Sequence, residues 1–157
     1  MRVINNTILK NYLISIIIPT YNRIDLLERA LNSVVNQTYK NWEIIVVDNN
    51  STNKIDKLIK RYSEFNIKLF KINNNGVIAA SRNLGIKNSK GNLIAFLDSD
   101  DWWKPKKLYS SIKIFTKYQN IDLVYHNCIL TSTYRKKNSH CRNLKENKFQ
   151  DLVINGN

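Results

Sequence analysis

The sequence predicts an α/β fold built on an open, mostly parallel sheet flanked by helices. Short apolar segments typical of buried strands alternate with segments whose apolar residues recur at helical spacing. The 157 residues, 43% of them hydrophobic, suffice for one domain with a substantial core. Because only four glycines and two prolines are present, we expect no flexible linker within this pattern.

The first half of the chain contains two predicted strands, each followed by a helix. Residues 13–18 are almost uniformly apolar, as in a strand buried on both faces, and we expect Pro19 to end this strand. A single apolar stripe predicts a helix over residues 24–35. A second buried strand, at 43–48, precedes a helix over 55–62.

The same alternation continues through residue 97. Residues 67–72 alternate between apolar and polar side chains, which predicts a strand near an edge of the sheet. A turn at 73–76 leads into a short helix over 77–87. A strand at 93–97 completes an order of strands and helices that favours parallel pairing through right-handed crossovers.

The C-terminal part is less regular. Its pattern predicts a helix over 105–118 and a strand over 121–130. We therefore expect one α/β domain over residues 12–130. Residues 131–157 are basic, polar and poorly periodic, and we interpret them as a tail or as the start of a further, incomplete part.

The formal net charge of +13 is unevenly distributed. Residues 1–101 carry 14 basic against 9 acidic side chains, and residues 102–157 carry 11 against 3. A basic surface attracts nucleic acid, anionic lipid headgroups or phosphorylated ligands, or it serves only to keep the protein soluble. No nucleic-acid-binding motif is visible, so we expect no nucleic acid among the partners.

The sequence contains neither a secretory signal nor an apolar stretch of the roughly 18 residues that a membrane span requires. We therefore expect a cytoplasmic protein. The basic C-terminal part is compatible with peripheral contact with an anionic membrane on its inner face.

Polar side chains follow three of the predicted strands, at 19–22, 48–51 and 98–101. Because ligands of open parallel sheets bind at the carboxyl ends of the strands, these three clusters should share one edge. The third cluster holds Asp98, Asp100 and Asp101, whose oxygens suit a hard divalent cation. The alternative is an ordinary acidic turn that caps the following helix.

Five segments, in this order, resemble the successive motifs of family 2 glycosyltransferases. They are residues 15–22 (SIIIPTYN), 37–39 (QTY), 42–51 (WEIIVVDNNS), 81–86 (SRNLGI) and 96–101 (FLDSDD). The resemblance implies a GT-A fold with a Rossmann-like nucleotide-binding half. It also implies transfer of a sugar, with inversion, from a UDP- or dTDP-sugar donor to a saccharide or lipid-linked acceptor.

The resemblance assigns the nucleoside to the first two strand ends. Tyr21 would stack on the pyrimidine ring, with Pro19 shaping the loop; the alternative is a tyrosine packed beside the turn. Asp48 and Asn49 would bond the base and its surroundings. Many family members carry aspartate where Asn49 stands, but an amide oxygen also accepts a hydrogen bond from a pyrimidine ring, so both bases stay possible.

The resemblance assigns the diphosphate and a Mg²⁺ or Mn²⁺ ion to the third strand end. Asp98 and Ser99 would lie beside the donor, and Asp98 and Asp100 would bind the metal. Such ions keep several non-protein ligands, so one or two carboxylates suffice. Arg82 would help to balance the diphosphate charge; the alternative is a solvated helix arginine.

The C-terminal part departs from the family pattern. Only 56 residues follow Asp101, and the acceptor-binding part is therefore short or truncated. Asp122, Glu146 and Asp151 are the acidic residues of this part, and none stands in the context of the family's catalytic base. The catalytic residue is unassigned, and a non-catalytic, nucleotide-sugar-binding fragment is the alternative to an active transferase.

Overall fold

The computed structural model describes residues 12–52, 54–118, 120–131 and 136–139, the last range for its backbone alone. The chain divides into two compact units, 1–119 and 120–157. We expected a boundary near residue 130 because we predicted a continuous strand up to that point.

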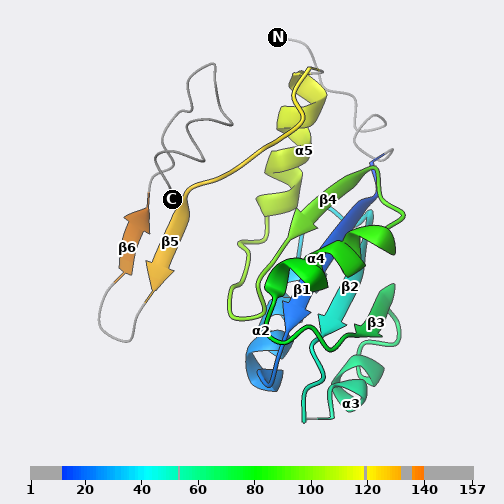
Figure 1. Ribbon diagram of the computed structural model, residues 1–157. Helices are drawn as coiled ribbons and strands as arrows, with labels where there is room; N and C mark the ends of the chain where they lie inside the picture. The colour runs from blue at the N-terminus through cyan, green and yellow to red at the C-terminus, as the bar shows by residue number, and fades with distance from the viewer. Residues whose placement is uncertain (1–11, 53, 119, 132–135, 140–157) are drawn as a thin grey trace. The chain divides into compact units, whose positions relative to one another are not determined.

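The first unit contains one four-stranded sheet in which all pairs are parallel (Figure 1). The strands lie in the order β3-β2-β1-β4. Their bounds are Ile14–Thr20 for β1, Trp42–Asp48 for β2, Ile67–Lys71 for β3 and Leu93–Phe96 for β4. The predicted parallel sheet and the edge position of the third strand are confirmed.

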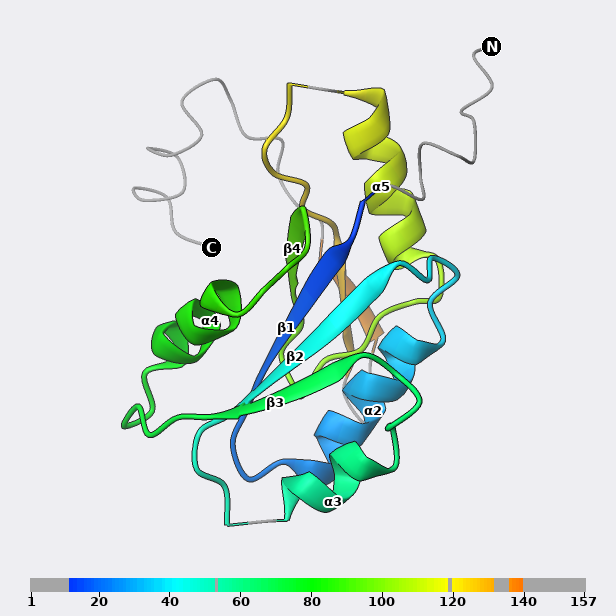
Figure 2. The same ribbon diagram turned by 90° about the vertical axis from the view of Figure 1, so that its right-hand side faces the viewer.

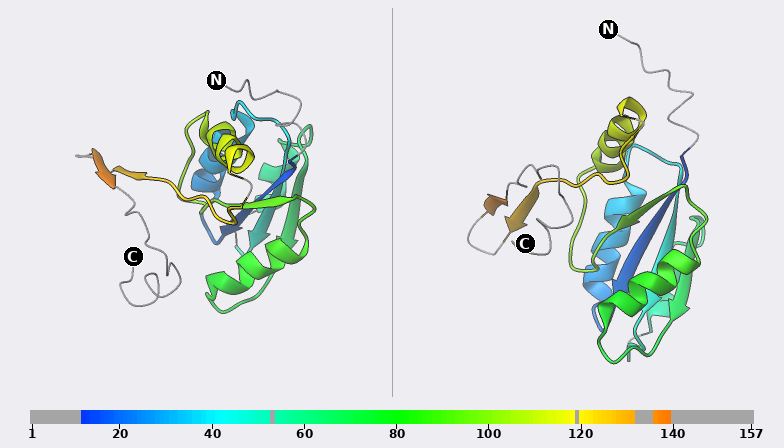
Figure 3. Two further views of the ribbon diagram at one scale, coloured as in Figure 1. Left: turned by 90° about the horizontal axis from the view of Figure 1, so that it is seen from above. Right: turned by 45° about the horizontal axis from the view of Figure 1, so that its top comes forward.

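Helices cover both faces of this sheet (Figures 2 and 3). Helix α4 (Ile78–Lys87) packs on one face. The other face carries α2 (Ile24–Val35), α3 (Ile55–Lys60) and α5 (Lys107–Lys117). Within the described ranges, no helix combines the length and apolarity required to cross a membrane.

Strand β1 is buried along its whole length because both of its faces are covered. Ile16 and Ile18 point into the core with α2, whereas Ile17 points toward α4. The approach of α4 is close at Gly85, where an added Cβ would lie 2.4 Å from Cγ2 of Ile17. The nearly uniform apolar character of this strand therefore follows from its central, two-sided position.

The prediction that Pro19 ends β1 is wrong, because the strand continues through Thr20. The carbonyl of Ile17 accepts a hydrogen bond from the Leu97 amide of the β4 segment. The backbone polar groups of successive strand residues point to opposite neighbouring strands. Pro19 therefore faces the β4 side, as Ile17 does. The pairing with β4 ends at Ile17, so the missing N–H of Pro19 breaks no ladder bond.

The second unit contains a short antiparallel pair, β5 (Cys128–Thr131) with β6 (Lys136–Ser139). The predicted strand over 121–130 is wrong for residues 121–127. Among the described residues, no strand pairs with 121–127, and Leu123 is 66% exposed. Strand-forming residues adopt a strand only where a neighbour satisfies their backbone groups.

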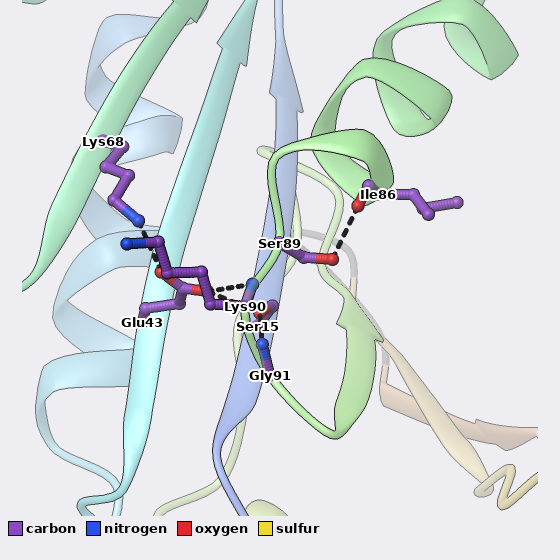
Figure 4. A network of polar contacts seen from close by, with 7 residues as sticks. All are labelled: Ser15, Glu43, Lys68, Ile86, Ser89, Lys90 and Gly91. Atoms are coloured by element: carbon purple, nitrogen blue, oxygen red, sulfur yellow. Dashed lines mark hydrogen bonds and ion pairs between the residues drawn. The ribbon is translucent and has the colours of Figure 1, made fainter.

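A buried carboxylate connects the strands at the amino end of the first unit's sheet (Figure 4). Glu43 on β2 is 1% exposed and accepts hydrogen bonds from the Ser15 hydroxyl (2.7 Å) and the Lys90 amide (2.7 Å). Its second oxygen pairs with the Lys68 ammonium of β3 at 2.8 Å. The Gly91 amide donates to the Ser15 hydroxyl, so the loop before β4 is held by the same group.

Replacing Glu43 with glutamine should lower the free energy of unfolding by about 1–3 kcal/mol. The buried side chain loses its negative charge and its ion pair with Lys68. Urea denaturation measures the loss. Asp56→Asn is the matched control, because it removes the exposed Asp56–Lys71 pair and should change stability little. Equal losses in the two variants would contradict the structural role of Glu43.

The effect of Glu43 should depend on pH. Burial alone would raise the pKa of Glu43, but the Lys68, Ser15 and Lys90 hydrogen bonds together hold it below the ordinary 4.5. The carboxylate therefore stabilises the fold above about pH 4.5, and this contribution is lost as the pH falls through the lowered value. The difference in unfolding free energy between wild type and Glu43→Gln should narrow from pH 7 to about pH 3. A constant difference would contradict the stabilising role of the Glu43 carboxylate.

Candidate functional site

A pocket of about 290 Å³ lies at the carboxyl edge of the sheet. The strand order reverses between β1 and β4, and such a reversal is where open α/β sheets form a ligand crevice. The pocket is lined by Pro19, Thr20, Tyr21, Arg23, Asn49, Asn74, Gly76, Ile78, Ser81, Asp98, Ser99 and Asp100.

The loops that follow β1 and β2 are joined to each other by side-chain hydrogen bonds. Asn22 has a left-handed φ of 49°, a conformation that asparagine tolerates better than most residues. Its amide N–H donates to the Ser51 hydroxyl at 2.8 Å, and its side-chain oxygen accepts from the Thr52 amide at 2.8 Å. The two loops therefore present Tyr21 and Asn49 on a fixed support.

Of the three residues predicted to contact the pyrimidine base and its surroundings, Tyr21 and Asn49 line the pocket, whereas Asp48 does not. Tyr21 is 55% exposed and lines the pocket, so its side chain is not buried beside the turn. The Asn49 side-chain oxygen accepts from the Asn74 amide at 3.0 Å, which leaves one of its lone pairs and its NH₂ group for other partners.

Asp48 lies at the end of β2 but is not part of the pocket wall. Its side chain is 2% exposed, and Oδ1 accepts from both the amide and the hydroxyl of Ser51. The structure thus gives this carboxylate a positioning role: it shapes the turn that carries Asn49.

The acidic segment after β4 reaches the pocket through Asp98, Ser99 and Asp100. Helix α5 begins only at Lys107, and the residue before it makes no side-chain cap hydrogen bond. The alternative interpretation of the acidic run as a helix cap is therefore wrong.

Each of the two carboxylates at the pocket is paired with an arginine. Arg82 on α4 approaches Asp98 with Nη2 at 2.7 Å from Oδ1. Arg23, which precedes α2, pairs through Nη1 with Oδ2 of Asp100. Arg82 is therefore not a solvated helix arginine, and the acidic segment is electrostatically balanced from two sides.

The third carboxylate of the run shows the effect of crowding. Partial burial raises the pKa of Asp101, and the negative charges of Asp100 and Asp98 raise it further, while Arg29 lowers it. Added positive charge at this segment would relieve that repulsion.

Helix α2 and the turn after it hold the segment that follows the carboxylates. Gln37 is fully buried, donates to the Lys104 carbonyl at 2.8 Å and accepts from the Leu108 amide at 3.0 Å. The Trp103 amide donates to the Ser33 hydroxyl. The Lys107 ammonium lies 3.7 Å from the Trp103 ring centroid, and its burial lowers the pKa of Lys107 to about 8.

Two buried polar atoms at the site have no hydrogen-bond partner among the described residues: the Thr20 hydroxyl oxygen and Nε of Arg82. Thr20 lines the pocket, and Arg82 is paired with a pocket residue. Such buried atoms are normally satisfied by water, an ion or a ligand.

The carboxylates at the pocket suit a metal ion that binds to the protein and to a phosphate group at the same time. The part of the chain that the structure describes contains no cluster of three His, Cys, Asp or Glu side chains that would enclose a metal by itself. Asp98 and Asp100 supply carboxylate oxygens at one pocket. Mg²⁺ is commonly bound by one or two carboxylates together with substrate phosphates, and this arrangement suits such an ion.

Several lining residues were not predicted from the sequence. Thr20 and Ser81 lie within the quoted motifs, but no role was assigned to them. Asn74 and Gly76 were read only as a turn, although their place after the third strand would have marked them by the same edge rule. Arg23 follows the first strand end closely, yet nothing in its own sequence context indicates that it pairs with Asp100.

The fold and this edge define the class of protein: an α/β domain with a polar pocket at the carboxyl ends of its parallel strands. Residues 15–157 match Glycosyl transferase family 2. The chain belongs to this family, and the predicted GT-A fold is confirmed by the structural comparisons.

Similar proteins are found among curated proteins and solved structures. The chain is 38% identical over 117 residues to the Escherichia coli enzyme UDP-Glc:alpha-D-GlcNAc-diphosphoundecaprenol beta-1,3-glucosyltransferase WfgD, which covers 74% of this chain and 46% of that protein. TarS 1-349 of S. aureus in complex with UDP matches with a TM-score of 0.64 and 29% identity, over 68% of this chain and 32% of that one.

A third comparison supports the fold alone. The mannosyltransferase PcManGT from Pyrobaculum calidifontis, in complex with GDP-Man and Mn²⁺, matches with a TM-score of 0.61 and 24% identity, over 66% of this chain and 32% of that one. This chain spans between 15% and 46% of the length of the curated relatives that it matches.

Replacing Asn22 with alanine should lower the free energy of unfolding by about 1–3 kcal/mol, because alanine resists the left-handed φ and the bond to Thr52 is lost. Asn22→Gly is the matched variant: it keeps the conformation but loses the bond, and should cost less. Urea denaturation of both variants measures this order. Equal stability of wild type and both variants would show that the joined loops are not needed.

Proposed function

We propose that this chain carries the donor-binding part of a glycosyltransferase that takes a sugar from a UDP- or dTDP-sugar. The observation that carries the proposal is the meeting of an exposed tyrosine, an asparagine amide and two carboxylates in one pocket at the sheet edge. The UDP-glucose donor of WfgD and the UDP bound to TarS support a uridine donor.

The nucleoside is bound at the ends of β1 and β2. Tyr21 stacks on the pyrimidine through its exposed ring, and Asn49 pairs with polar atoms of the base through its remaining lone pair and its NH₂ group. Asp48 supports this contact by holding the Ser51 turn beside Asn49.

The diphosphate is bound beside the acidic segment. Asp98 and Asp100 are the residues that would hold a Mg²⁺ or Mn²⁺ ion beside the phosphates. When bound, this ion stabilises negative charge on the departing nucleoside diphosphate. Arg82, with a guanidinium Nε that lacks a partner among the described residues, donates to the phosphates from the α4 side.

The reaction breaks the bond between the sugar C1 and the diphosphate oxygen, while an acceptor hydroxyl forms the new bond to C1 from the opposite face and gives up its proton. Inversion follows from this single displacement, which requires a general base near the acceptor. The described residues of the first unit supply the binding and charge stabilisation. The base belongs to the acceptor-binding part of the protein.

A saccharide or lipid-linked acceptor is the second substrate of this proposal. WfgD is named for an undecaprenol-linked acceptor, which supports a lipid-linked one. Peripheral contact with an anionic membrane would bring the protein to such an acceptor, with the basic residues after 102 as the source of attraction. Residues 140–157 of this basic part lie outside the described residues.

Calorimetric titration with UDP and with dTDP should show binding that strengthens when Mn²⁺ is added. Asp100→Asn should reduce the Mn²⁺-dependent affinity by about ten-fold or more, since even outer partners of a metal site cause losses of that size. Glu64→Gln, which removes an exposed carboxylate before β3, is the control and should bind as wild type does.

Absence of nucleotide binding at millimolar concentration, with and without Mn²⁺, would contradict the proposal. Release of the sugar from UDP-glucose, by hydrolysis or by transfer, separates an active transferase from a binding fragment. An active chain should lose this turnover in the Asp100→Asn variant, whereas a fragment binds the donor and leaves it intact.

A further inference from the structure

Arg23 has no role in the binding scheme above, yet it touches the centre of the site. It stands between Asn22, with its left-handed φ, and the first residue of α2. Its side chain lines the pocket, and its guanidinium Nη1 donates to Oδ2 of Asp100. It therefore occupies an oxygen of a carboxylate that would otherwise be available to a divalent cation.

A second arginine, Arg29 of α2, holds the main chain of Asp100 close to Arg23. Nη2 of Arg29 donates to the main-chain carbonyl of Asp100. The Arg29 guanidinium carbon lies 4.3 Å from the ring centroid of Trp102, which keeps this side chain beside the acidic segment. The backbone of Asp100 is thus fixed from α2, and only the Arg23 side chain needs to move to free the carboxylate.

A guanidinium and a divalent cation cannot both use the same carboxylate oxygen without repelling each other. The Arg23–Asp100 pair is half exposed, with 52% and 47% of the two side chains accessible, so it is weak and reversible. A diphosphate offers Arg23 a better partner, because guanidinium groups bind phosphate oxygens through two parallel hydrogen bonds.

We propose that Arg23 competes with the divalent cation for Asp100 and leaves it when a nucleoside diphosphate binds, so that cation and nucleotide bind in mutual dependence. This inference rests on the proposed function and names a residue that couples its two ligands. The cation alone binds weakly because Arg23 covers its ligand. The nucleotide draws Arg23 to the phosphates and exposes Asp100, and by linkage the cation strengthens nucleotide binding by the same factor.

The test measures Mn²⁺ binding in the absence of nucleotide, from the electron paramagnetic resonance signal of free Mn²⁺. Arg23→Ala should bind Mn²⁺ about three- to ten-fold more tightly than wild type, because an exposed ion pair and one nearby positive charge each contribute a factor of a few. Adding UDP should then improve Mn²⁺ affinity less in the variant than in wild type.

Two further variants identify the cause. Arg61→Ala removes one positive charge and another exposed ion pair, Arg61–Glu28 at 3.0 Å, and should leave nucleotide-free Mn²⁺ affinity unchanged. In Arg23→Ala combined with Asp100→Asn, the gain in affinity should disappear, which locates the cation at Asp100.

Unchanged or weaker Mn²⁺ binding by Arg23→Ala without nucleotide would overturn the inference, even where UDP binding stays Mn²⁺-dependent and the proposed function stands. An equal gain in Arg61→Ala would also overturn it, since net charge would then be the cause. If wild type fails to bind UDP, the proposed function fails, and the nucleotide-free gain in Arg23→Ala still decides the competition at Asp100.

Discussion

The parallel pairing of β1 with β2 on one side and β4 on the other is the constraint on which the site depends. Because the three strands run in the same direction, their carboxyl ends bring three separate loops to one edge. The pairing is maintained by complete burial of β1 between α4 and the three helices of the opposite face. At the amino end, Glu43 connects β1, β2 and β3 with the loop before β4, far along the strands from the pocket.

The site itself is organised by charge. Three carboxylates within four residues would repel one another, and partial burial together with this repulsion raises the pKa of Asp101. Arginines from two directions, Arg82 on α4 and Arg23 before α2, offset this repulsion. The same guanidinium groups suit a diphosphate, so the groups that stabilise the acidic segment are also the groups that a ligand would recruit. Binding and stability at this edge are therefore linked through the same side chains.

Much of the first unit could be predicted because local pattern and burial agree there. The apolar run before Pro19 is buried on both faces, and the polar strand ends share one edge, as expected. The sequence could not reveal that the pairing of β1 with β4 ends before Pro19, or that 121–127 has no paired strand among the described residues, because both depend on tertiary contacts. Likewise, the burial of Asp48 against Ser51 and the pairing of Arg23 with Asp100 join residues whose proximity arises only in the folded chain.

The central claim, that a nucleoside diphosphate and a divalent cation meet at Asp98 and Asp100, is tested most directly by nuclear magnetic resonance with Mn²⁺ as a paramagnetic probe. With UDP present, substoichiometric Mn²⁺ should broaden the backbone amide signals of Asp98–Asp101 and of Thr20 and Tyr21 across the pocket. The amides of Ser15, Glu43 and Lys90, at the opposite end of the sheet, should stay sharp. Broadening centred elsewhere, or none at the acidic segment, would contradict the account.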